Sequence, residues 1–297
     1  MIIKKLDIHA HVTLEKQYPC SMYATKYPLT PDELRPMYDK IGVEKGLLLP
    51  LASPEFMADQ LTIRTARHAV ALHPETCGWW FCNIDPRWMT NSPDADLSIP
   101  MEFYKSQGAK GIGELTANLP IDNPLMENLF HHAEKCELPI LFHMGHMNGG
   151  DYGIVDELGL SKLEGALKKF PKLRLIGHSQ KWWAEISGDC NEENRNGYPK
   201  GPVTPGGRVV ELMRNYPNMC GDLSAGSGSN AIMRDPEFGY KFLEEFQDQL
   251  YFGTDYSYLG LYFPLSKFLD EGVEMGRISQ KAYNKICREN LLSLVEK

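Results

Sequence analysis

The chain begins with a short apolar run that carries two histidines, Leu6-Asp7-Ile8-His9-Ala10-His11-Val12. Alternate side chains of a β-strand point to the same side, so His9 and His11 share one face if this run is a strand. Two neighbouring imidazoles can hold one divalent cation. The run therefore predicts an N-terminal strand that ends in part of a metal site.

Seven further runs of this kind follow. They are short, often β-branched or aromatic, and bounded by Gly, Pro or Asn, which predicts buried strands. Together with the first run, the predicted strands cover residues 5–12, 45–52, 77–84, 110–115, 139–144, 173–178, 219–223 and 250–255. Helical apolar spacing separates them over residues 31–41, 55–73, 95–107, 124–136, 161–170, 207–215 and 236–248, and a last helix is predicted over 279–295.

A strand followed by a helix, repeated eight times, is typical of a parallel sheet with crossover helices. Eight repeats in about 300 residues fit a closed (β/α)₈, or TIM, barrel. The alternative is an open doubly wound sheet, which usually has Gly-x-Gly-x-x-Gly after its first strand. Here Thr13-Leu14-Glu15-Lys16 follows the first strand, and Gly111-Ile112-Gly113 lacks a third glycine. The sequence thus favours a single barrel domain over residues 1–297.

Composition excludes several function classes. The 297 residues are 42% hydrophobic and 24% charged, with a net charge of −8. This suits one well-packed α/β domain and argues against nucleic acid, which needs a basic face. No apolar run is long enough for a membrane span, and none at the N-terminus resembles a signal peptide. Seven scattered cysteines predict reduced thiols and a cytoplasmic location.

Six residues that commonly bind metals stand where predicted strands end. They are His9, His11, Glu114, His143, His178 and Asp255. The carboxyl ends of barrel strands converge on one mouth, so these side chains are expected to meet there. The other histidines lie on predicted helices or loops and are interpreted as structural.

Imidazole and carboxylate ligands suit a divalent cation, with zinc as the first choice and manganese or iron as alternatives. His9, His11, His143 and Asp255 are predicted ligands, and Asp255 could also exchange a proton with a metal-bound water. His178 could complete a second metal position or stand free and polarise the substrate. Glu114 could bridge two ions or only orient a ligand, so the count of one or two ions stays open.

The ordered set of motifs resembles the amidohydrolase superfamily. More closely, it looks like the amidohydrolase 2 branch, which includes aminocarboxymuconate-semialdehyde decarboxylase. The motifs are His9-Ala10-His11, Glu114, Leu141-Phe142-His143, Gly177-His178, Gly253-Thr254-Asp255, Asn83-Ile84-Asp85-Pro86-Arg87 and Ile286-Cys287-Arg288-Glu289-Asn290-Leu291. The resemblance implies a deformed barrel with metal at His9, His11, His143 and Asp255. It makes His178 a catalytic group beside one zinc in decarboxylase-like members and a ligand in two-metal members.

The position of Glu114 favours hydrolysis over decarboxylation. A Glu at the fourth strand resembles the deoxyribonuclease-like branch, and the decarboxylase branch does not require it. Lys110 begins that strand, so a carboxylated lysine is not expected. The sequence therefore predicts a hydrolase that cleaves an amide, lactone or ester of a small molecule through a metal-activated water. The alternatives are a nonoxidative decarboxylase of an aromatic or unsaturated acid and a non-enzymatic binding module.

Substrate contacts are expected from residues near the predicted mouth. Arg87 could hold an acid group, as could Lys181, Arg195 or Arg208, and Trp182 and Tyr256 could stack on a planar substrate. Two long connections, 13–29 and 181–205, are predicted rim loops. The sequence does not specify an oligomeric state, and a homodimer is one option because dimers are the commonest soluble assembly.

Overall fold

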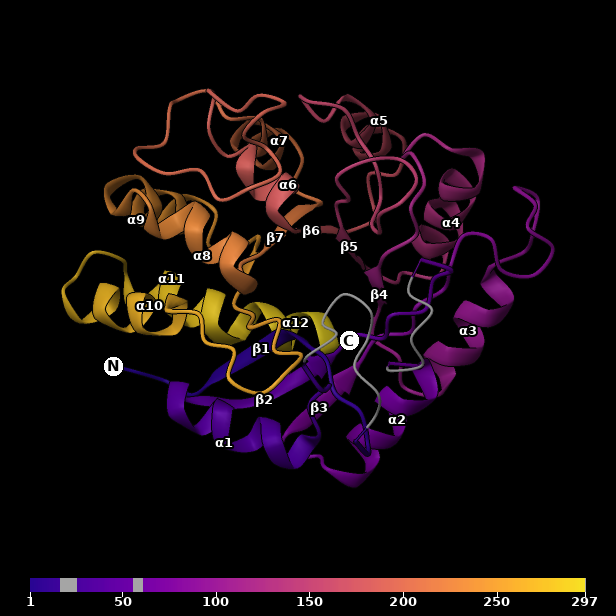
Figure 1. The fold of residues 1–297 in the computed structure, drawn as a ribbon, viewed down its shortest axis with the longest axis horizontal. Coiled ribbons are helices and arrows are strands. Elements are labelled where there is room, and N and C mark those ends of the chain that lie inside the picture. Colours follow the sequence, from indigo (N-terminus) through magenta and orange to yellow (C-terminus); the bar gives the residue numbers. More distant parts are fainter. Residues whose placement is uncertain (17–25, 56–60, 297) are drawn as a thin grey trace.

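The computed structural model describes residues 1–16, 26–55 and 61–296. Within these ranges, eight strands pair in parallel with their sequence neighbours (Figure 1). They are β1 (Lys5–Ala10), β2 (Val43–Leu48), β3 (Cys77–Trp80), β4 (Ile112–Leu115), β5 (Ile140–His143), β6 (Leu175–His178), β7 (Met219–Asp222) and β8 (Leu250–Tyr251). Each lies inside or within two residues of a predicted strand.

The strands form two sheets, β1-β2-β3 and β4-β5-β6-β7-β8, whose edges meet through single bridges. At one seam Cys82 bridges Ile112, and Gly113 N donates to Cys82 O at 2.9 Å. At the other, Ala10 bridges Tyr256, and Asp255 N donates to His9 O at 2.7 Å. Backbone hydrogen bonds therefore continue around the ring, as the predicted deformed (β/α)₈ fold requires.

Helices cover the outside of the ring (Figure 1). Their bounds are α1 (Pro31–Ile41), α2 (Ile63–Leu72), α3 (Ser98–Ser106), α4 (Pro124–Lys135), α5 (Ser161–Lys169), α6 (Gln180–Ala184), α7 (Arg208–Asn215), α8 (Ala225–Met233), α9 (Pro236–Glu245), α10 (Leu265–Glu274), α11 (Gln280–Asn284), the π-helix η2 (Lys285–Glu289) and α12 (Asn290–Val295). Helix α1 has its predicted bounds because Thr30 and Glu33 form a capping box and Gly42 ends it at φ +73°.

Three helices were not predicted, and the predicted helix at 279–295 is divided by the π-turn. Helix α6 is only five residues long and follows β6 after one residue. Helix α8 contains two glycines and two serines, which are poor helix formers; a Cβ at Gly228 would lie 2.3 Å from Leu223 O, so close packing selects glycine there. Helix α10 carries Leu265, Phe268 and Leu269 at helical spacing, a signal that the sequence did offer.

Apolar side chains form two separate layers. The barrel interior contains Leu6, Ile8, Leu47, Leu49, Phe81, Leu141, Ile176, Cys220 and Tyr251, together with Leu291, Leu294 and Val295 of α12. A larger cluster fills the space between strands and helices. Because α12 contributes to the inner layer, it covers one end of the barrel and leaves the other end for polar side chains.

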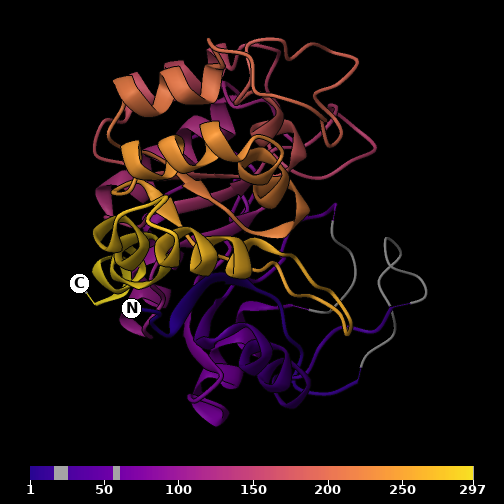
Figure 2. The ribbon, with the colours of Figure 1, turned by 90° about the vertical axis from the view of Figure 1, so that its left-hand side faces the viewer.

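The two ends of the barrel differ in what they carry. Figure 2 shows both chain termini on one side and the long connections after β6 and β8 on the opposite side. Part of the predicted rim loop 13–29, including Tyr18 and Tyr23, lies outside the described residues, as does Phe56 of the predicted helix 55–73. In rim loop 181–205, buried Arg195 pairs with Glu185 at 2.5 Å, which fastens the loop to the body. In the described ranges, every helix is too short or too polar to traverse a bilayer.

Candidate metal centre

All six predicted metal-site residues come together at the carboxyl ends of their strands. His9 is in β1 and His11 follows it, Glu114 is in β4, His143 ends β5, His178 ends β6 and Asp255 follows β8. His143 and His178 are directly paired neighbours across β5 and β6. Five of the six are buried, and Asp255 is the most accessible, with 27% of its side chain exposed.

Four of these side chains aim one atom each at a common point. His9 Nε2 and His11 Nε2 are 2.9 Å apart. Glu114 Oε2 lies 3.4 and 3.3 Å from these nitrogens, and Asp255 Oδ1 lies 3.5 and 3.3 Å from them. A tetrahedral ion bound at about 2.0–2.1 Å separates its ligand atoms by about 3.3–3.4 Å. The spacing therefore fits one divalent cation.

The second oxygens of the two acids face the other histidines. Glu114 Oε1 lies 2.8 Å from His143 Nδ1, and Asp255 Oδ2 lies 3.8 Å from His178 Nε2. Ligand atoms of Glu114, His143 and His178 all lie within 4.8 Å of one another, as do those of His9, His178 and Asp255. Glu114 thus stands between two groups of ligands, and the geometry accommodates one ion or two.

The charge of the site also calls for a cation. Glu114, Asp222 and Asp255 lie together, and within the described part of the chain none of them has a Lys or Arg within ion-pair distance. Burial lowers the pKa of His9, but Asp255, Glu114 and Asp222 more than offset this and raise it well above its usual value. The pKa of His11 is raised to about 9 against the effect of burial, by Asp255 and Glu114. Without a metal, His9 and His11 would take up protons to neutralise the acids.

Residues behind the ligands fix their orientation. Asp222 Oδ2 lies 2.7 Å from His9 Nδ1 and 3.1 Å from His178 Nδ1, and Leu49 O lies 2.9 Å from His11 Nδ1. Protonation of these nitrogens leaves each Nε2 free for a metal or a substrate. Burial raises the pKa of Asp222, yet His9 and His178 hold it well below its usual range, so it stays ionised.

Sequence reasoning did not find Ser224 or the role of Asn83 at this site. Ser224 Oγ donates to Asp222 Oδ2 at 2.7 Å and lies 3.1 Å from His178 Nδ1. Asn83 Nδ2 donates to Glu114 O at 2.5 Å, which fixes the backbone of that acid. The signal for both was their location just after a predicted strand or at its end.

The backbone is strained where it presents two of these side chains. Asp255 has φ +56° and Ser179, directly after His178, has φ +106°. Such values are uncommon for residues other than glycine and cluster at functional sites. Asp7 stabilises the turn at β8, because its Oδ1 accepts from Thr254 N at 2.8 Å and from His9 N at 2.9 Å.

Two of the three predicted substrate contacts, Trp182 and Tyr256, are buried aromatic rings. Trp182 is fully buried in the outer layer against Gly177 and Phe142, and Tyr256 is buried there beside Tyr38 and Phe263. Both rings follow a strand end and pack in the apolar layer between strands and helices, so the structure adds no support for their stacking on a substrate.

Arg87 is also engaged by other groups. It forms two 2.9 Å bonds with Glu55, and Asp85 Oδ2 accepts from its Nη2 at 2.7 Å. Arg195 and Arg208 are paired with glutamates too. Lys181 differs, because its Nζ donates to the carbonyl of His146 and no carboxylate in the described ranges lies within ion-pair distance.

No family model matches this chain, and no curated protein is similar to it in sequence. Solved structures do share its fold. A 5-carboxyvanillate decarboxylase from Novosphingobium aromaticivorans, complexed with manganese and 4-hydroxy-3-methoxy-5-nitrobenzoic acid, has a TM-score of 0.60 at 14% identity over 99% of this chain and 96% of its own. The 2,6-dihydroxybenzoate decarboxylase from Rhizobium has a TM-score of 0.58 at 16% identity, and amidohydrolase 2 from Bifidobacterium longum subsp. infantis has 0.56 at 12%, both over 99% of each chain.

These likenesses confirm the predicted resemblance at the level of fold. They contradict the prediction of a hydrolase, because the similar structures include several decarboxylases. The error came from Glu114. A carboxylate that lies between histidines can serve as a metal ligand in a lyase as well as in a hydrolase, so its presence does not distinguish the two reactions.

Proposed function

We propose that this chain is a metal-dependent nonoxidative decarboxylase of an aromatic or unsaturated carboxylic acid, with residues 1–297 acting as one catalytic domain. The carrying observation is a buried cluster of four histidines and two acids at the mouth of a barrel whose fold matches decarboxylases along nearly its whole length. The substrates in those names are small aromatic acids, a class that this proposal takes over for the present chain.

The metal ligands in this proposal are His9, His11, His143 and Asp255, with Glu114 as a further ligand between the two groups. A divalent cation held there supplies a Lewis acid that binds oxygen atoms of the substrate and withdraws electron density from the carbon that loses its carboxylate. Zinc and manganese both suit this donor set, and the manganese in one structural neighbour favours neither for this chain.

Asp255 is proposed as the group that transfers the proton. Its Oδ1 faces His9 and His11, whereas its Oδ2 faces His178 and the side chain is the most exposed of the cluster. In the reaction the bond between the substrate carbon and its carboxylate breaks and carbon dioxide leaves. The electron pair stays on that carbon, which takes up one proton, and Oδ2 of Asp255 is placed to deliver it.

His178 and Lys181 are proposed to hold the substrate. The Nδ1 side of His178 contacts Asp222 and Ser224, so its Nε2 is free to donate to a substrate oxygen. Lys181 stands three residues further on, is buried, and lacks a carboxylate partner among the described residues. It is therefore a better candidate than Arg87 for attracting the acid group.

The test is a reaction in heavy water with protein loaded with Zn²⁺ or Mn²⁺. A panel of hydroxylated benzoic acids and unsaturated acids is supplied, and carbon dioxide and deuterium in the product are measured. We expect one carbon dioxide per acid consumed and one deuterium on the carbon that lost it, with loss of both on chelation. Asp255→Asn should abolish turnover, whereas Asp122→Asn, an exposed aspartate, should not. A fully loaded protein that releases no carbon dioxide from any acid of the panel would contradict the proposal.

A further inference from the structure

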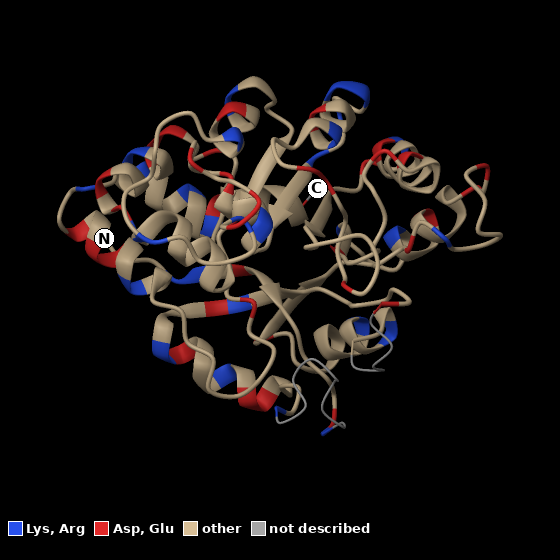
Figure 3. Ribbon diagram, turned by 45° about the horizontal axis from the view of Figure 1, so that its top comes forward, with Lys and Arg blue, Asp and Glu red and all other residues tan. Residues whose placement is uncertain are grey.

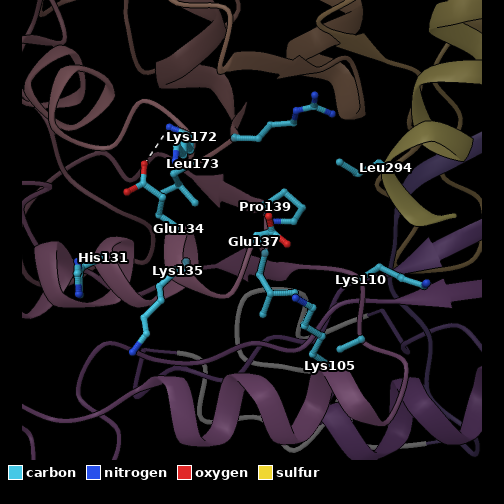
Figure 4. Close-up of a pocket in the computed structure, with 14 residues that line it drawn as sticks. Lys105, Lys110, His131, Glu134, Lys135, Glu137, Pro139, Lys172, Leu173 and Leu294 are labelled. Carbon is cyan, nitrogen blue, oxygen red and sulfur yellow. Dashed lines mark hydrogen bonds between the residues drawn. The ribbon is translucent and has the colours of Figure 1, made fainter. Parts of the chain in front are cut away.

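Figure 4 shows the residues that line an open pocket of about 790 Å³. This pocket lies at the end of the barrel opposite to the proposed metal ligands. Its wall includes Lys110, Pro139 and Arg174, which precede β4, β5 and β6, and Leu294 of α12. The metal-ligand cluster instead takes Glu114, His143 and His178 from the other ends of these three strands. At about 3.3 Å per residue, four residues separate the two sites by about 13 Å.

The pocket is basic in an acidic protein. Lys105, Lys110, Lys135, Lys172 and Arg174 line it with only two carboxylates, Glu134 and Glu137, whereas the whole chain has a net charge of −8. Glu134 is already occupied, because its Oε1 accepts from the backbone N of Lys172 at 2.8 Å (Figure 4). On the outer helices, by contrast, both signs are interspersed (Figure 3).

None of these five cations has a carboxylate within ion-pair distance among the residues that the structure describes. Lys105 Nζ donates to the carbonyl of Cys136 at 2.6 Å, and Arg174 donates one bond to Tyr251 Oη at 3.0 Å. Both are thereby positioned by neutral oxygen atoms, which leave their charge uncompensated. A guanidinium has five N–H donors, so Arg174 retains several for a ligand.

We propose that this pocket binds a small polyanion, a molecule with at least two phosphate or carboxylate groups on an apolar body. Its volume lies within the usual range for small-molecule sites, about 300–1,000 Å³. Leu138, Pro139, Leu173 and Leu294 provide the apolar part of the lining. Such a ligand is distinct from the proposed substrate, because the strands and the inner apolar layer separate the two sites.

Adenosine 3′,5′-bisphosphate is a suitable probe, since it carries two phosphates and a flat adenine ring whose faces can pack on apolar side chains, and it chelates metals weakly. Binding is measured by calorimetry on the metal-loaded protein at low salt. We expect saturable one-to-one binding that weakens as salt is added. In Lys110→Gln/Lys172→Gln the dissociation constant should rise about tenfold. Neither lysine side chain makes a hydrogen bond or ion pair within the described ranges, so this variant should fold normally.

Two controls give the result its meaning. Lys241→Gln/Lys267→Gln removes the same charge from exposed helices and should leave binding unchanged. His11→Gln removes a proposed metal ligand and should also leave it unchanged, which separates this proposal from the proposed function. The proposal is overturned by an absence of saturable binding, by equal weakening in both lysine pairs, or by loss of binding in His11→Gln.

Discussion

The two ends of the barrel differ in the charge of their side chains and in how those side chains are held. At the carboxyl end, the imidazoles and all acids but Asp255 are buried, and a neighbour holds His9, since Asp222 lies 2.7 Å from its Nδ1. At the other end, lysines surround an open pocket and have no carboxylate partner among the described residues. The first arrangement fixes ligand atoms for one ion or two through contacts between side chains. The second provides charge without fixed geometry, which suits a ligand recognised mainly by its charge.

The largest effect should come from removing a metal ligand. His11→Ala takes away one of the four atoms that converge on a common point, whereas Lys110→Gln changes only the opposite pocket. Carbon dioxide release should fall by about 10³-fold or more in the first variant and change less than about twofold in the second. Metal content by mass spectrometry should fall only in His11→Ala. Comparable losses in both variants would mean that the two ends are not separate.

A loss of stability is expected when a buried side chain is removed from the apolar layer between strands and helices. Trp182 is fully buried against Gly177 of β6, with its ring in the outer layer. Trp182→Ala should reduce the free energy of unfolding by about 3–5 kcal/mol because it leaves a cavity. Phe103→Ala, at a side chain 56% exposed, should reduce it far less. Denaturant unfolding measures both, and the KM for the acid should stay unchanged. A raised KM with unchanged stability would show that Trp182 contacts the substrate and does not serve packing alone.

A smaller loss of metal affinity is expected when Asp222, which contacts two of the histidines, is replaced. Asp222 Oδ2 is a shared acceptor for His9, His178 and Ser224. In Asp222→Asn one carboxylate oxygen becomes an NH₂ donor, so the two imidazole rings lose their fixed orientation. Metal affinity should fall about 10–100-fold. Competition with a fluorescent chelator measures it, and Asp248→Asn, at an exposed site, is the matched control. Unchanged affinity would show that Asp222 only supports the fold.

The sequence predicted that the six candidate ligands meet, because each of them ends an apolar run and parallel strands bring such ends together. His143 and His178, for example, are 35 positions apart and become paired neighbours. It did not show that Trp182 and Tyr256 are buried in the outer layer, because a strand-end position does not reveal which way the next turn points a side chain. It also missed the basic pocket, since Lys110 and Lys172 look like ordinary surface lysines until α12 and three strand starts enclose them.

The smallest effect tests whether the cations of the pocket repel one another when no anion is bound. Removing two of them in Lys110→Gln/Lys172→Gln should raise the free energy of unfolding by a few tenths of a kcal/mol at low salt, because like charges near a surface repel at this scale. The gain should disappear at about 0.5 M salt, where screening is strong. Lys241→Gln/Lys267→Gln breaks two favourable surface pairs instead and should give no gain at either salt concentration. Thermal unfolding at two ionic strengths distinguishes these outcomes. If the pocket variant is no more stable than the wild type at low salt, the lysines of the pocket do not repel one another. The difference between the hydrogen-bonded side chains at the carboxyl end of the barrel and the unpaired lysines at the other end would then be smaller than the structure indicates.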